Sequence, residues 1–243
     1  MRHILKAAVL LAAASLSACS LQPAASEVDA QFRSIFKNMP VDRVAKSEIA
    51  GVYEIYSGGK LFYFAPDKQL MMFGEMYTST GVSLTQEKVQ AYLNARTLSI
   101  PEDVGTVVGD GPVELISFIA PDCGYCAQAH RWIEDRNYEG LRLRVFFMPM
   151  EVGTPNYARA QQFICAPPEL RREALRQVYA HEDPAPGQSF LTCADGANQL
   201  ARQAQIAKDL GVEGTPTFSL KGQTVLGFRQ DRLEQLLSST TTQ

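Results

Sequence analysis

The chain has 243 residues, of which 46% are hydrophobic and 20% are charged, and its formal net charge at pH 7 is −3. This length predicts one large domain or two small ones, and the composition excludes a globally disordered chain. The 23 basic residues are outnumbered by 26 acidic ones, which argues against a nucleic-acid-binding protein.

Residues 1–18 have the pattern of a signal peptide. A basic start, Met1–Lys6, precedes twelve uncharged residues, a stretch shorter than the roughly 20 that a transmembrane helix needs. The segment ends in Leu-Ser-Ala-Cys, which resembles the lipobox of bacterial lipoproteins and implies that Cys19 is acylated. By the same resemblance, Ser20 favours the outer membrane over the inner membrane. We therefore expect membrane contact only through this lipid anchor.

The alternative to lipidation is ordinary cleavage near residues 24–26, which leaves Cys19 in the discarded peptide. In both cases four of the five cysteines remain in an exported protein, where disulfides persist.

A tether and a small β-rich domain are expected next, over residues 19–30 and 31–83. Apolar residues recur at helical spacing within residues 31–39. A meander of three or four strands is then predicted, over residues 51–56, 60–64 and 70–74. The connections are too short for parallel crossovers, so this sheet should be antiparallel.

A helix is predicted over residues 84–97, because Ser83 and Gln86 form a capping box and apolar residues follow at helical spacing. It belongs to a linker, residues 84–104. The Gly/Pro/Asp-rich segment 105–112 then marks the domain boundary.

Residues 105–243 are expected to form an α/β domain, because strand and helix patterns alternate. Its strands are predicted over residues 113–120, 141–148, 217–220 and 224–228. Its helices are predicted from Cys123 to about Arg136, over roughly 155–183 and 194–210, and over 231–238.

The pair Cys123 and Cys126 follows the buried strand directly and opens a helix, which is typical of a redox-active CxxC motif. The backbone N–H groups and the dipole of the helix N-terminus should favour the thiolate of Cys123, the attacking species in disulfide exchange. Asp122 should oppose this slightly. One alternative is a zinc site that also uses residues such as Cys165, Cys193, His130 or His181. The other is a purely structural disulfide.

Thr215 and Pro216 stand just ahead of a predicted strand, far downstream of the cysteines. This order resembles the thioredoxin superfamily, in which a cis-proline faces the CxxC pair, and it implies that the Thr215–Pro216 bond is cis. A trans proline that starts an edge strand is the alternative.

More narrowly, the chain resembles the DsbC/DsbG family of periplasmic disulfide isomerases over most of residues 30–240. The resemblance implies an α+β fold: a cystatin-like antiparallel dimerisation domain, a helical linker and a thioredoxin-fold α/β domain with a helical insertion. It also implies a homodimer shaped like a V, protein clients that contain disulfides, and a DsbD-type membrane reductase. Neither a cofactor nor a metal is implied. Clients would be held by Thr215, Pro216, Thr217 and Tyr125.

The same resemblance implies that Cys165 and Cys193 form a structural disulfide within the helical insertion. The alternative is two reduced, buried cysteines that pack as small apolar side chains.

Ser117 departs from the family pattern, since thioredoxin-like enzymes often carry an acid six residues before the first cysteine. A buried carboxylate relay is therefore not expected. His130 can tune the charge of the cysteines but is expected to be partly exposed, with a local hydrogen bond.

The function predicted from these observations is isomerisation of wrong disulfides in the periplasm. A net oxidase, or a reductase for one client, on the same scaffold is the first alternative. A chaperone-like or adhesive lipoprotein without redox activity is the second.

Overall fold

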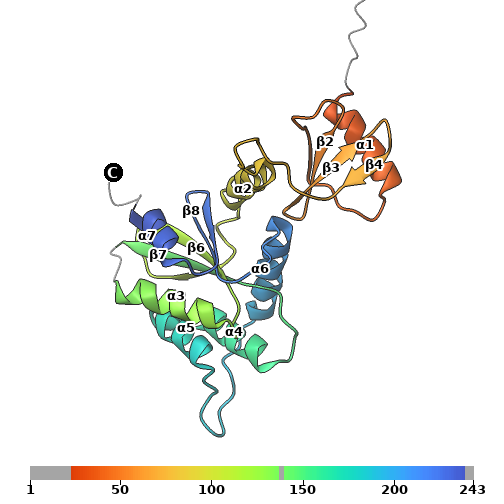
Figure 1. The fold of residues 1–243 in the computed structure, drawn as a ribbon. Coiled ribbons are helices and arrows are strands. Elements are labelled where there is room, and N and C mark those ends of the chain that lie inside the picture. Colours follow the sequence, from red (N-terminus) through yellow and green to blue (C-terminus); the bar gives the residue numbers. More distant parts are fainter. Residues whose placement is uncertain (1–22, 137–139, 239–243) are drawn as a thin grey trace, which may run out of the picture.

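The structure, a computed structural model, describes residues 23–136 and 140–238. The ribbon divides into a small N-terminal domain and a larger C-terminal domain, with helix α2 (Leu84–Thr97) between them (Figure 1). This arrangement confirms the predicted α+β class with two domains and a helical linker. No helix in the described part of the chain is long and apolar enough to cross a membrane.

The N-terminal domain packs helix α1 (Ala25–Ile35) against a four-stranded sheet, and Val28 and Phe32 of that helix are completely buried against Ile55 and Phe64. The sheet order is β1-β2-β3-β4, and every neighbouring pair is antiparallel, as predicted. Its strands are β1 (Arg43–Lys46), β2 (Tyr53–Ser57), β3 (Lys60–Ala65) and β4 (Leu70–Met72).

The predicted tether over residues 19–30 is too long at its C-terminal end. Helix α1 already begins at Ala25, because the Glu27 carboxylate accepts a hydrogen bond from the Ala24 N–H and Val28 is drawn into the core. The helix predicted over residues 31–39 therefore starts six residues earlier and ends at Ile35. Residues 19–22 lie outside the described residues.

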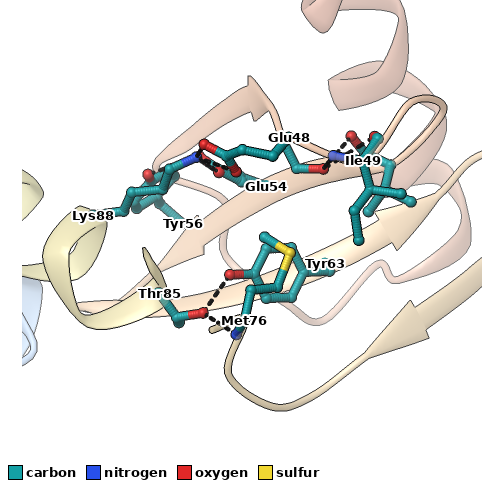
Figure 2. Close-up of polar contacts among 10 residues, drawn as sticks. Glu48, Ile49, Glu54, Tyr56, Tyr63, Met76, Thr85 and Lys88 are labelled. Atoms are coloured by element: carbon teal, nitrogen blue, oxygen red, sulfur yellow. Dashed lines mark hydrogen bonds and ion pairs between the residues drawn. The ribbon is translucent and has the colours of Figure 1, made fainter. Parts of the chain in front are cut away.

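The first turn of α2 is fixed to the N-terminal sheet by buried polar contacts (Figure 2). The Thr85 hydroxyl lies 2.5 Å from the Tyr63 hydroxyl and accepts a hydrogen bond from the Met76 N–H at 2.8 Å. Lys88 forms an ion pair with Glu54, whose side chain is only 3% exposed. These contacts tie the start of the linker to strands β2 and β3.

The last turns of α2 contact the C-terminal domain. The Thr97 hydroxyl accepts a hydrogen bond from the Ser219 hydroxyl at 3.1 Å, and the Asn94 side-chain oxygen accepts one from the Thr224 hydroxyl at 3.2 Å. The linker is therefore hydrogen-bonded to the N-terminal sheet at its start and to the C-terminal domain at its end. These bonds fix the orientation of α2 relative to both domains.

A second contact joins the domains at the β2–β3 turn. Gly59 lies so close to Gly211 that a Cβ atom on Gly59 would stand 2.4 Å from the Gly211 Cα. Both glycines have positive φ angles, +77° and +68°, which larger residues rarely adopt. Beside them, Lys60 pairs with Glu213 at 2.8 Å. The segment from Gly211 leads directly to Thr215 and Pro216 of the C-terminal domain.

The C-terminal sheet has the order β5-β7-β6-β8-β9, in which β6 and β7 are parallel and the other pairs antiparallel. Its strands are β5 (Thr106–Val108), β6 (Val113–Ile119), β7 (Leu141–Phe147), β8 (Thr217–Leu220) and β9 (Gln223–Leu226). The α-helices of this domain are α3 (Gly124–Asp135), α4 (Pro155–Cys165), α5 (Arg171–Ala180), α6 (Gly196–Leu210) and α7 (Gln230–Ser238). A short 3-10 turn, Pro168–Leu170, precedes α5.

The sheet separates two buried clusters. Leu115 and Ile119 of β6 belong to the larger cluster, together with residues of α3, α4, α5 and α7. Ile116 and Phe118 belong to the smaller one, with Ala207 and Leu210 of α6. This alternation along β6 follows from the two-residue period of a strand that is covered on both faces.

Candidate redox site

Cys123 and Cys126 lie where strand β6 gives way to helix α3. Cys123 is the N-cap residue of α3, with extended backbone angles, and its sulfur accepts a hydrogen bond from the Cys126 N–H at 3.1 Å. The two sulfurs are joined in a disulfide. The sequence therefore places the first cysteine at the helix end, where a side-chain acceptor completes an otherwise unpaired backbone N–H.

The two sulfurs differ in access to solvent. Cys126 is completely buried, whereas Cys123 is half-buried and its neighbour Gly124 is exposed. A disulfide of another protein can therefore reach Cys123 but not Cys126. This asymmetry agrees with the prediction that Cys123 is the attacking cysteine, and it leaves Cys126 out of contact with solvent.

The electrostatic surroundings favour negative charge on Cys123. Its sulfur already accepts a backbone N–H bond, and the first turn of α3 contains no acidic residue. Asp122 stands beside it in sequence, but its side chain is exposed and screened by water. We therefore expect the helix N-terminus to be the main source of stabilisation for a Cys123 thiolate in the reduced protein.

The Thr215–Pro216 bond is cis. Phe118 of β6 pairs with Thr217 at the start of β8, so the proline loop and the cysteine loop extend from the same end of two neighbouring strands. Pro216 is buried, and its carbonyl accepts a hydrogen bond from the Gly227 N–H at 2.8 Å. The proline loop is therefore fixed by the sheet beside the redox pair.

Among the predicted client-binding residues, Thr217 and Thr215 differ in what their backbones offer. Strand β8, which begins at Thr217, is paired on both sides, with β6 and with β9. Thr215 takes part in no backbone hydrogen bond with the described residues. The backbone groups of Thr217 are therefore largely used within the sheet. Those of Thr215 are free to form hydrogen bonds with an added strand of a client. Tyr125, next to the accessible sulfur, is 66% exposed.

His130 is buried, contrary to the prediction that it is partly exposed. Only 4% of it is accessible, and its Nε2 lies 3.0 Å from the hydroxyl of Ser117, which is completely buried in β6. The sequence contains a signal for this burial, because His130 shares helical spacing with other residues of one buried stripe on α3. The stripe consists of Cys126, Ala129, His130 and Ile133. The polar pair lies buried between α3 and β6, one helical turn after Cys126.

Burial lowers the pKa of His130 from its ordinary value of 6.5 to about 4. Between these pH values the unfolded chain binds a proton at His130 that the folded protein does not, so the free energy of unfolding falls as the pH falls. We expect His130 to account for about 3 kcal/mol of this loss between pH 6.5 and pH 4.

The check is guanidinium unfolding of the oxidised protein at pH 7 and pH 4.5, for the wild type and His130→Gln. The wild type should lose more stability than the variant on acidification. An equal loss in both proteins would contradict the assignment.

Cys165 and Cys193 are joined in a second disulfide, which connects the end of α4 to the segment before α6. Gly196, the first residue of α6, makes room for it, since a Cβ atom there would stand 2.8 Å from the Cys165 sulfur. Because these two sulfurs bond to each other, they are not free to act as zinc ligands with the CxxC pair. Cys19 lies outside the described residues.

Comparisons with known proteins agree with this geometry. Residues 19–86 match the disulfide bond isomerase protein N-terminal domain family, and residues 100–239 match the thioredoxin-like domain family. The "Probable thiol:disulfide interchange protein DsbC" of Bordetella pertussis is 28% identical over 234 residues, which cover 91% of this chain and 77% of that protein. The protein of the same description from Bordetella parapertussis is 25% identical over 234 residues, which also cover 91% of this chain and 77% of that protein.

Two solved structures have a similar fold. The catalytic domain of Proteus mirabilis ScsC has a TM-score of 0.52 at 16% identity and covers 63% of this chain and 99% of its own. The thiol-disulfide exchange protein alpha-DsbA2 from Wolbachia pipientis has a TM-score of 0.51 at 15% identity and covers 63% of this chain and 97% of its own.

Proposed function

Because this chain belongs to the thioredoxin-like domain family and carries a disulfide bond isomerase N-terminal domain, as thiol:disulfide interchange proteins of the DsbC type do, we propose that it isomerises wrong disulfides in exported proteins. The observation that carries the proposal is the pairing of an accessible Cys123 sulfur with a buried Cys126 sulfur at a helix N-terminus. In this arrangement the Cys123 sulfur can attack a client disulfide, while the Cys126 sulfur stays buried until the mixed disulfide is resolved.

In the proposed reaction the Cys123 thiolate attacks one sulfur of a client disulfide. A mixed disulfide forms between Cys123 and the client, the client disulfide breaks, and the second client sulfur leaves as a thiolate. That thiolate attacks elsewhere in the client, and a final client thiolate displaces Cys123. The client has then exchanged one disulfide for another with no net oxidation or reduction.

When no rearrangement follows, Cys126 attacks the Cys123 sulfur, the client leaves reduced by two electrons, and the enzyme retains the disulfide. A reductant must then restore both thiols. We assign this role to a membrane reductase of the DsbD type, since the enzyme acts in an oxidising compartment.

Clients are held, in this account, by the segment around Thr215, whose free backbone groups suit an added strand. Tyr125 supplies an exposed aromatic surface beside the attacking sulfur. Thr217, already paired on both sides, positions the loop instead.

The N-terminal match supports a homodimer, in which two redox sites share one cleft and raise the local concentration of client disulfides at the thiolates. The DsbC-type relatives and the leader pattern support a periplasmic location. The Leu-Ser-Ala-Cys sequence supports an outer-membrane lipid anchor on Cys19.

A net oxidase, or a reductase for one client, remains the second candidate, because the same sulfur pair serves all three reactions. A fragment that begins at Leu84 distinguishes isomerase activity from oxidase or reductase activity. It keeps α2, whose Asn94 and Thr97 bond to the catalytic domain, but lacks the N-terminal sheet. We expect this fragment to reduce insulin at a rate close to that of the full chain and to lose most of its ability to refold scrambled ribonuclease. Equal ribonuclease refolding by the fragment and the full chain would remove the isomerase assignment and favour the alternative.

A further inference from the structure

An uncharged polar pair is buried between β6 and α3, and one of its members, Ser117, stands where thioredoxin-like enzymes often carry an acid. Ser117, six residues before Cys123, lies in β6 with its hydroxyl 3.0 Å from the Nε2 of His130. His130 follows Cys126 by one helical turn on the same buried face of α3. Because side chains in a helix lean toward its N-terminus, His130 leans over the turn that holds Cys126.

The second nitrogen of His130 has no partner among the described residues. Its Nδ1 atom is buried, and so is the hydroxyl oxygen of Tyr179 on α5, which likewise has no partner there. The two rings meet edge to face, with centroids 5.2 Å apart. Both residues line a pocket of about 250 Å³ between α3 and α5, a volume that can hold several water molecules.

We propose that His130 accepts the proton of the buried Cys126 thiol during resolution and passes it to water in this pocket. The inference rests on the proposed exchange reaction and names a residue that serves its second half. Cys126 is completely buried, so its proton has no direct route to solvent. His130 lies one helical turn after Cys126 on the same buried face of α3, and it also lines the pocket between α3 and α5.

The Cys126 S–H bond breaks and its proton moves to the imidazole of His130, while the Cys126 sulfur forms a bond to Cys123. The bond between Cys123 and the client sulfur breaks, and the client sulfur leaves as a thiolate that takes a proton from water. His130 then releases its proton to the pocket, and Ser117 keeps the imidazole oriented throughout.

The charges around His130 come from two helices. Arg131 and Glu134 on its own helix and Arg176 on α5 line the pocket with it. Strands β6 and β8 face it with uncharged groups, Ser117 and Phe218. Burial alone keeps the imidazole neutral in the disulfide form, at a pKa of about 4. A thiolate beside it adds an attractive charge, which raises its proton affinity as the sulfur ionises.

The test uses the fully reduced chain and 5,5′-dithiobis(2-nitrobenzoate) in stopped flow. Attack by Cys123 releases one thionitrobenzoate, and resolution by Cys126 releases a second, so the two steps are recorded as separate phases. We expect His130→Gln, which keeps hydrogen-bonding atoms but cannot take up a proton, to slow the second phase about a hundredfold at pH 7. Its first phase should stay within about twofold of the wild type.

The pH profile distinguishes proton transfer from a structural role. In the variant the second phase should rise about tenfold per pH unit, because only spontaneous ionisation of Cys126 remains, whereas the wild-type rate should change less. His181→Asn is the matched control: His181 is exposed and caps α5 at a φ of 55°, which asparagine tolerates. It should match the wild type in both phases.

Identical second phases in His130→Gln and the wild type at every pH would overturn the inference, and so would equal slowing of both phases. A missing first phase in the wild type would instead overturn the proposed function. If His130→Gln does not fold, the pH profile of the second phase in the wild type is the measurement. A wild-type second phase that rises about tenfold per pH unit from pH 5 to pH 8 would show spontaneous ionisation of Cys126 and would overturn the inference.

Discussion

Replacement of Cys123 with serine is expected to lower both insulin reduction and scrambled-ribonuclease refolding by roughly three orders of magnitude or more, to the uncatalysed level. Cys123 carries the accessible sulfur, and Cys126 is completely buried, so no other thiol of the redox pair can reach a client. A serine hydroxyl does not ionise at neutral pH and cannot take part in disulfide exchange.

Cys126→Ser is the matched variant for this experiment, because it leaves the attacking sulfur in place and removes only resolution. It should accumulate a one-to-one mixed disulfide with the client, visible on a non-reducing gel and by intact mass. If Cys123→Ser retains wild-type activity in either assay, or if Cys126→Ser traps no client, the assignment of attacking and resolving roles is wrong.

Removal of the second disulfide is expected to have the largest effect on stability. Cys165 and Cys193 are 28 residues apart, and closure of a loop of this size is worth about 3–4 kcal/mol in the chain-entropy model. We therefore expect the double variant Cys165→Ala/Cys193→Ala to lower the free energy of unfolding by about that amount. Guanidinium unfolding of the oxidised proteins measures this difference.

The same double variant should keep its redox chemistry below the unfolding midpoint. The second disulfide joins α4 to the segment before α6, whereas the redox pair caps α3. The alkylation rate of Cys123 in the folded, reduced variant should therefore equal that of the wild type. Free energies of unfolding that coincide within about 0.5 kcal/mol would show that the disulfide does not stabilise the domain.

Strong local patterns were sufficient to predict the elements that carry the site. The apolar run over residues 113–120 became β6, and Ser83 caps the start of α2 at Leu84 by accepting a hydrogen bond from the Gln86 N–H. Each of these signals is contained within one segment of the chain. The secondary structure that it predicts therefore does not depend on which other segments pack against it. The position of the CxxC pair at a helix start followed from the same local information.

Strands β1 and β5 could not be predicted in this way. The first contains only four residues with a lysine and an arginine at its ends, and the second contains three residues beyond a glycine. Strands this short show no clear two-residue period. Their existence depends on pairing with neighbouring strands: β1 pairs with β2, the next strand in the chain, and β5 pairs with β7, which is distant in sequence.

The contact between Ser117 and His130 shows the same limit at the site itself. The sequence places His130 one turn after Cys126, but only the packing of α3 on β6 brings its ring to a hydroxyl 13 residues away. The isolation of the Tyr179 hydroxyl likewise depends on how α5 packs against α3. Contacts between polar groups of different helices and strands produce no periodic pattern in a single sequence, so they cannot be predicted from it.

The most direct measurement is the pH dependence of iodoacetamide alkylation at Cys123 in the reduced protein, followed by mass spectrometry of the labelled peptide. A thiolate held by the N-terminus of α3 should give an alkylation profile with a midpoint at least about one unit below 8.5. A midpoint at about 8.5, the value of an ordinary thiol, would contradict the account.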